Sequence, residues 1–233
     1  MNNLIEIKNL TKTYDKRITA VNNISLIVPK GRIVGLLGPN GSGKTTLIKM
    51  INGLLSPDNG SILINGTAPG PETKKHIAYL PDCTYLEGNK KIYQLIDFYA
   101  DFYDDFQKDK AYTMLQSLNI DSNVKYKTLS KGTKEKIQLI LTMSRNADLY
   151  ILDEPIAGVD PAARDYILKT IITNYNPEAS ILLSTHLISD IEAILDDVIF
   201  IKYGQIALYC PVDAIREEQG KSIDAYFREV FSC

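Results

Sequence analysis

Short apolar runs alternate with stripes of apolar residues at helical spacing along most of the chain. Runs of about five residues, too short for helices, predict buried strands. They lie at residues 33–37, 61–65, 77–80, 149–152 and 180–184, with a hairpin at 198–201 and 205–209. Helical spacing is found from Leu47 to Leu55, over 91–118, after Ser130, after Pro161, and over 187–195, 211–219 and 222–231. This alternation predicts an α/β fold with a mainly parallel sheet covered on both faces.

Two segments depart from this alternation. Residues 4–8 and 20–28 are typical of two strands joined by a polar bend around Asp15, which predicts an N-terminal antiparallel β portion. Residues 83–146 form a predicted helical insertion, and nine of the chain's 20 aromatic residues lie between Tyr85 and Tyr126. Most of these rings are expected in the core, but their excess makes the insertion the best candidate for a protein-docking surface.

The composition of the chain mainly argues against certain classes of function. The 233 residues are 45% hydrophobic, enough for a large core, and the formal net charge of −2 argues against non-specific binding to nucleic acid or anionic lipid. No apolar run approaches the roughly 18 residues of a membrane span, and the polar start is not typical of a signal peptide. A membrane role is therefore expected to act through a partner. Cys83, Cys210 and Cys233 are odd in number and far apart, so we expect reduced thiols.

The strand at 33–37 leads into GPNGSGKT at residues 38–45, and a helix is predicted directly afterwards. Glycines let backbone N–H groups point inward, and the helix N-terminus adds its dipole to this anion cradle. Lys44 can reach the β- and γ-phosphates, and the Thr45 hydroxyl can coordinate Mg²⁺. The strand and helix on either side argue against a chance glycine-rich turn. The sequence therefore predicts a P-loop NTPase core that binds a nucleoside triphosphate.

Candidate catalytic residues follow two of the predicted strands. Asp153 is placed to hold Mg²⁺, and Glu154 beside it is placed to polarise a water for attack on the γ-phosphate. His186 follows the strand at 180–184, at the edge where such folds bind ligands, and can hydrogen-bond the γ-phosphate or the water. By themselves, two acids after a strand are often a helix cap and a single histidine is usually structural. The P-loop makes the catalytic interpretation the stronger one.

The segment LSKGT at residues 129–133 has two unusual features for a helix start. Ser130 is a predicted N-cap. Three lysines crowd positive charge at this N-terminus, where the helix dipole disfavours it, and Gly132 costs about 1 kcal/mol of helix propensity relative to Ala. A simple cap leaves both features unexplained. They are explained if the turn receives an anion such as the γ-phosphate of ATP.

Taken together, GPNGSGKT, LSKGT, LYILDEP, GVD and the STH that ends at His186 resemble the ATP-binding subunit of ABC transporters. The resemblance covers almost the whole chain, with 1–233 as a single ATP-binding domain and 83–146 as its inserted helical subdomain. It implies an ATPase that powers transport through ATP-dependent head-to-tail dimerisation with a second copy or a paralogous subunit. It also implies an integral membrane permease as partner, no nucleic acid, and a peripheral position on the cytoplasmic face of the cell membrane. The opening and closing segments most resemble bacterial ABC-2-type exporters.

The same resemblance assigns roles to individual residues. Glu154 and His186 would be catalytic, and Thr45, Asp82 and Asp153 would hold Mg²⁺. Tyr14 would stack on adenine, Ser130 and Gly132 would contact the γ-phosphate across the dimer interface, and Asp160 would lie in the loop linking the two sites. The implied nucleotide-binding residues are Tyr14, Gly38, Pro39, Asn40, Gly41, Ser42, Gly43, Lys44, Thr45, Thr46, Ser130, Gly132 and Asp160.

Two positions depart from the family pattern. Asp82 stands where the family usually has a Gln that binds Mg²⁺ and the lytic water. A carboxylate is a good Mg²⁺ ligand, but it is one methylene shorter and adds negative charge, so we expect activity to survive, slowed or more dependent on the partner. Lys131 replaces a Gly of the usual Leu-Ser-Gly-Gly-Gln. It either adds positive charge toward the γ-phosphate or faces solvent.

Two other functions stay open at this point. One is an ABC-type ATPase that acts in solution and is not coupled to transport; the absence of a second nucleotide domain or a long coiled coil in this sequence argues against it. The other is a regulatory module that binds ATP without hydrolysing it. The substitution at Asp82 allows this, whereas Asp153, Glu154 and His186 argue for hydrolysis.

Overall fold

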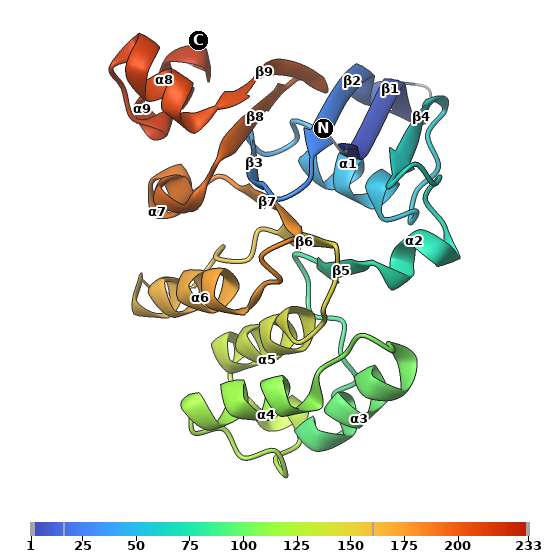
Figure 1. The fold of residues 1–233 in the computed structure, drawn as a ribbon, viewed down its shortest axis with the longest axis vertical. Helices are drawn as coiled ribbons and strands as arrows, with labels where there is room; N and C mark the ends of the chain where they lie inside the picture. Colours follow the sequence, from blue (N-terminus) through green and yellow to red (C-terminus); the bar gives the residue numbers. More distant parts are fainter. Residues whose placement is uncertain (1–2, 16, 160, 232–233) are drawn as a thin grey trace.

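A six-stranded sheet forms the centre of the molecule (Figure 1). The computed structural model describes residues 3–15, 17–159 and 161–231, with side chains at all of these except 161–163. The strand order is β5-β6-β7-β3-β8-β9, and β9 alone in this sheet runs antiparallel to its neighbour. The strands are β3 (Ile33–Leu37), β5 (Ile77–Leu80), β6 (Leu149–Asp153), β7 (Ser180–Thr185), β8 (Asp197–Lys202) and β9 (Gln205–Pro211). The mainly parallel sheet predicted from the sequence is confirmed.

A second, antiparallel sheet contains the N-terminal strands, as predicted. Its order is β2-β1-β4, formed by β1 (Asn3–Tyr14), β2 (Ile18–Pro29) and β4 (Asn59–Ile64). Strands β1 and β2 are longer than the sequence pattern indicates. Register shifts between them interrupt the alternation of apolar residues, but the two strands stay paired on both sides of each shift. Helix α1 (Lys44–Ile51) packs with β1, β2 and β4 in one hydrophobic cluster.

All of the remaining helices except α2 contribute to the hydrophobic cluster on the other face of the central sheet. Helices α3, α4 and α5 gather at one end of the molecule, and α8 and α9 lie beside β8 and β9 at the other (Figure 1). None of the helices in the described part of the chain combines the length and apolar composition that a membrane crossing needs. The helices are α2 (Pro71–Lys75), α3 (Ile92–Phe102), α4 (Lys108–Ser117), α5 (Lys131–Met143), α6 (Pro161–Asn174), α7 (Ile188–Ile191), α8 (Val212–Gln219) and α9 (Ile223–Phe231), with 3-10 turns η1 (Tyr126–Thr128) and η2 (Glu192–Ile194).

Strand β3 shows how the central sheet separates two cores. Successive side chains of a strand point to opposite faces. Ile33 and Leu37 join the cluster that contains α3, α5 and α6, whereas Val34 and Leu36 join the cluster of α1 and the antiparallel sheet. All five residues of β3 are buried, as expected for a strand covered on both faces.

Three predicted helices are wrong in extent. The helix expected over 91–118 is two helices, because residues 103–107 leave helical geometry between α3 and α4. Not all of its rings are in the core: Phe102 is 68% exposed. Helix α1 ends at Ile51 before reaching Leu54, because Gly53 takes a left-handed conformation with φ +61°. The stripe at 187–195 forms only the short α7 and the turn η2.

Candidate functional site

The ends of the parallel strands bring the predicted site residues to one edge of the sheet. The P-loop follows β3, Asp82 comes two residues after β5, Asp153 ends β6, and His186 follows β7. Ligands of parallel α/β folds bind at this carboxyl edge. One pocket there has a volume of about 300 Å³ and is lined by Ala20, residues 40–46, Asp82 and Glu154. The structure thus places most of the predicted phosphate-binding residues around a single cavity.

The P-loop depends on glycine where the backbone passes close to β2. Gly43 has φ +110°, and a Cβ at this position would lie 2.2 Å from the carbonyl oxygen of Ala20. No other residue fits this combination of conformation and contact. The tight turn sets the first residue of α1, Lys44, directly after the loop, so the helix N-terminus faces the cavity.

The Lys44 ammonium is held inside the loop. Its Nζ donates hydrogen bonds to the carbonyl oxygens of Gly38 (2.7 Å) and Pro39 (3.2 Å), and lies 3.9 Å from a carboxylate oxygen of Glu154. Burial lowers the pKa of Lys44, and the nearby charges of Glu154 and Asp153 partly offset this effect. An anionic phosphate is a stronger acceptor than a neutral carbonyl, so the ammonium is placed to exchange these partners for a nucleotide.

Asp153 is a fully buried carboxylate with one oxygen unused. Its Oδ1 accepts a hydrogen bond from the Ser184 hydroxyl, whereas Oδ2 is buried with no hydrogen-bond partner among the described residues. Burial raises its pKa, the hydrogen bond from Ser184 and the nearby Thr45 hydroxyl lower it, and the charges of Asp82 and Glu154 raise it further. Excess negative charge, an unused oxygen and a nearby hydroxyl form an oxygen donor set that fits Mg²⁺.

The described carboxylates do not form a complete metal-binding site by themselves. Among the described residues, no three His, Cys, Asp or Glu side chains come close enough to hold a metal ion as a group. Mg²⁺ usually binds through one or two carboxylates together with phosphate oxygens and water. The arrangement around Asp153 therefore suits a metal ion that arrives with the nucleotide.

Glu154 lies between a lysine and an imidazole. Its backbone is left-handed, with φ +51°, and its N–H donates to the Ser184 carbonyl oxygen (3.0 Å). One carboxylate oxygen lies 3.0 Å from Nδ1 of His186 and the other faces Lys44. Strained backbone of this kind is typical of functional sites, where the surroundings hold it in place. A carboxylate so oriented at the phosphate pocket can accept a proton from an attacking water.

Other predicted residues lie at the margin of the pocket or away from it. The hydroxyl of Tyr14 is 3.4 Å from Oγ1 of Thr46, which places an exposed ring beside the P-loop. Ser130 and Gly132 do not line the pocket. Asp160 lies outside the described residues.

The turn at Ser130 is open to the surroundings. The Ser130 hydroxyl accepts a hydrogen bond from the Thr133 N–H (3.2 Å), which confirms the predicted N-cap. A Cβ added at Gly132 would meet nothing within 4 Å. The Lys131 side chain is 79% exposed, with Nζ 3.9 Å from Glu135. The first turn of α5 is therefore free to contact another molecule.

Sequence reasoning missed Ser184, whose hydroxyl binds Asp153 and whose carbonyl binds the Glu154 N–H. Strands β6 and β7 are neighbours, with Asp153 paired to Ser184. A polar residue near the end of a predicted parallel strand is the feature of the sequence that could have pointed to Ser184.

The two described cysteines, Cys83 and Cys210, are free thiols.

Comparisons with known proteins identify the family of the chain. The sequence profile described as ABC transporter matches residues 21–157, more than half of the chain. The SkfA peptide export ATP-binding protein SkfE of Bacillus subtilis (strain 168) is 35% identical over 216 residues, covering 89% of this chain and 90% of the relative. The ABC transporter ATP-binding protein YtrB of the same strain is 30% identical, covering 97% and 78%.

A solved structure, described as the ATP binding subunit of an ABC transporter, aligns with a TM-score of 0.87 at 29% identity, covering 97% of this chain and 99% of the other. Fold, phosphate pocket and sequence similarity thus lead to one family. The chain belongs to the ABC transporter family, as an ATP-binding subunit that hydrolyses ATP to power transport.

Proposed function

We propose that two copies of this chain, or one copy and a paralogous subunit, enclose two ATP molecules head to tail and drive an exporter. The open turn at Ser130 and Gly132 carries this proposal. It has the features of an anion site, yet it does not line the chain's own phosphate pocket. In a head-to-tail pair, this turn would complete the pocket of the partner. ATP then favours the closed pair by mass action, and hydrolysis releases it.

Each pocket binds one nucleotide through the residues assigned above. The P-loop N–H groups and Lys44 hold the phosphates, and Tyr14 stacks on adenine. Mg²⁺, held by Thr45, Asp82 and Asp153, would neutralise charge on the phosphates. The unused Oδ2 of Asp153 supports this assignment.

Hydrolysis uses Glu154 and His186. A water attacks the γ-phosphorus, the bond to the β,γ-bridging oxygen breaks, and the water proton passes to the Glu154 carboxylate. His186, 3.0 Å from Glu154, orients this carboxylate and hydrogen-bonds the γ-phosphate. The carboxylate of Asp82 replaces the family's usual amide, so we expect turnover to be retained but slower or more dependent on the partner.

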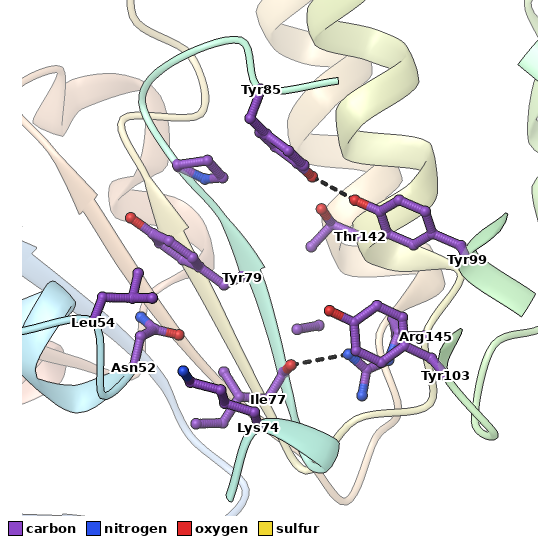
Figure 2. A pocket seen from close by; sticks show the side chains of 12 residues that line it. Asn52, Leu54, Lys74, Ile77, Tyr79, Tyr85, Tyr99, Tyr103, Thr142 and Arg145 are labelled. Carbon is purple, nitrogen blue, oxygen red and sulfur yellow. Dashed lines mark hydrogen bonds between the residues drawn. The ribbon is translucent and has the colours of Figure 1, made fainter. Parts of the chain in front are cut away.

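The partner docks on the aromatic groove between the helical end and the central sheet. We use this name for two pockets that share Tyr85, Tyr99 and Tyr103. Figure 2 shows one of these pockets, in which a hydrogen bond of 2.7 Å joins Tyr85 and Tyr99 and the Arg145 guanidinium packs against the Tyr103 ring. On α3, Phe98 and Phe102 are 52% and 68% exposed and stack on each other. An apolar segment of an integral membrane permease fits this surface.

Export is the direction that the relatives support. SkfE, 35% identical to this chain, is described as a peptide export ATP-binding protein. With the permease docked on the aromatic groove, the chain sits as a peripheral subunit on the cytoplasmic face of the membrane.

The double variant Phe98→Ser, Phe102→Ser tests the docking surface. We expect it to weaken association with the permease at least about tenfold, because two exposed aromatic anchors are lost. Basal ATP hydrolysis should not change, since neither residue lies at the phosphate pocket. The measurement is the amount of permease co-purified from detergent-solubilised native membranes. Ile172→Ser, at an exposed apolar residue of α6, is the control. Equal recovery with the double variant and with wild type would place docking elsewhere.

A further inference from the structure

The stretch that carries Asp82 has little regular structure to hold it. It follows β5 and reaches α3 only at Ile92. Asp82, Cys83 and Thr84 are all exposed. Asp82 nevertheless lies close enough to Asp153 for its charge to raise the pKa of that carboxyl. A side chain so exposed needs a support to keep a fixed distance from the metal site.

A buried amide of helix α5 supplies that support. Gln138 is 3% exposed, and its Nε2 donates a hydrogen bond to the Cys83 carbonyl oxygen (3.2 Å), next to Asp82. Its Oε1 accepts a hydrogen bond from the hydroxyl of Tyr126 (2.9 Å), which is itself 2% exposed. Burial raises the pKa of Tyr126, so this hydroxyl stays protonated and able to donate.

The two partners fix the orientation of the Gln138 amide. The Cys83 carbonyl oxygen can only accept, so the NH₂ group must face it and the amide oxygen must face Tyr126. Leaving a buried amide without partners is costly, which holds both contacts in place. Asp82, Gln138 and Glu154 also line one pocket of about 270 Å³, so Gln138 and the catalytic carboxylate face the same cavity.

We propose that Gln138 is a positioning residue, which locks the loop carrying Asp82 to helix α5 and thereby places the Asp82 carboxylate for Mg²⁺. This inference rests on the proposed metal role of Asp82. It has a consequence for the dimer, because Tyr126 lies four residues before Ser130. Gln138 therefore connects the loop at this subunit's own metal site with the segment that leads into the turn at Ser130, which the partner's nucleotide would contact.

Equilibrium binding without turnover tests the proposal. The ligand is an ATP analogue with a β,γ-imido bridge, titrated by calorimetry with and without Mg²⁺. In Gln138→Met, which keeps the length of the side chain, we expect the affinity gained from Mg²⁺ to fall about tenfold, as for other residues that orient a metal ligand. Affinity without Mg²⁺ should not change.

Ser144→Ala is the matched control. It removes a buried hydroxyl at the end of the same helix, which donates to the Ile140 carbonyl oxygen and makes no hydrogen bond to the loop that carries Asp82. It should keep the full gain from Mg²⁺. Hydrogen exchange gives a second readout, in which residues 82–85 should exchange faster in Gln138→Met than in Ser144→Ala. If Gln138→Met does not fold, Tyr126→Phe should show a smaller loss in the same direction.

Asp82→Asn distinguishes the proposed metal role of Asp82 from the proposed positioning of Asp82 by Gln138. If both Asp82→Asn and Gln138→Met lose the gain from Mg²⁺ and Ser144→Ala keeps it, positioning by Gln138 is supported. If only Asp82→Asn loses the gain, the metal role of Asp82 stands and positioning by Gln138 is overturned. If Asp82→Asn retains the gain, the metal role is wrong and the inference falls with it.

Discussion

Glu154→Gln should reduce ATP turnover at least about a hundredfold while leaving ATP binding close to wild type. The amide keeps the size of the side chain and its hydrogen bonding, but it cannot accept a proton from the attacking water. The phosphate contacts from Lys44 and the P-loop remain. Steady-state phosphate release measures turnover, and equilibrium titration with ATP measures binding.

Glu178→Gln, at an exposed glutamate beyond α6, controls for the loss of one negative charge and should hydrolyse ATP like wild type. Hydrolysis by Glu154→Gln at the wild-type rate would remove Glu154 from its assigned role. Wild-type protein that binds ATP and releases no phosphate under any condition would instead favour a regulatory module.

Arg145→Met should destabilise the folded chain by about 3–5 kcal/mol, the range for breaking a buried ion pair. Arg145 is 2% exposed, and its guanidinium binds the Asp105 carboxylate and the carbonyl oxygens of Lys75 and Ile77. Figure 2 shows the hydrogen bond to Ile77. It also lies 3.7 Å from the centre of the Tyr103 ring. Methionine fills part of the space but leaves these acceptors without a donor.

Denaturant unfolding, followed by circular dichroism, measures the effect. Lys108→Met, which removes an exposed ion pair with Asp97, is the control and should not shift the midpoint. An Arg145→Met midpoint equal to wild type would show that solvent or a rearrangement replaces the lost contacts.

The phosphate pocket could be predicted from the sequence because its parts are local. The P-loop needs only glycines between a strand and a helix, and Asp153, Glu154 and His186 each follow a recognisable apolar strand. Parallel strands end at one edge of a sheet, so these separate signals converge without any knowledge of side-chain contacts. The N-cap at Ser130 is local in the same way.

The break between α3 and α4 could not be predicted, because contacts from distant residues produce it. The apolar period continues through residues 91–118, with no Gly or Pro to mark an end. In the structure, the Gln107 N–H donates to the Ser144 carbonyl oxygen, and the Asn146 N–H donates to the carbonyl oxygen of Asp105. Phe106 also pairs with Arg145. Residues 105–107 therefore pair with residues about 40 positions later in the chain, whereas a continuous helix would bond them only to its own neighbouring turns.

The support of Asp82 was hidden for a related reason. Gln138 lies among apolar residues of α5, and nothing in its neighbourhood along the chain links it to Cys83, 55 residues earlier. Its role becomes visible only when the loop and the helix are seen together.

The head-to-tail pair is tested most directly by sedimentation of Glu154→Gln with Mg²⁺ and ATP. We predict a dimer that binds two ATP molecules and returns to monomer when ADP replaces ATP. Ser130→Arg, placed in the same background, should prevent this dimer while keeping ATP binding, because the open turn would no longer fit the partner's phosphates. A Glu154→Gln chain that stays monomeric with ATP bound would contradict a site shared between two copies of this chain.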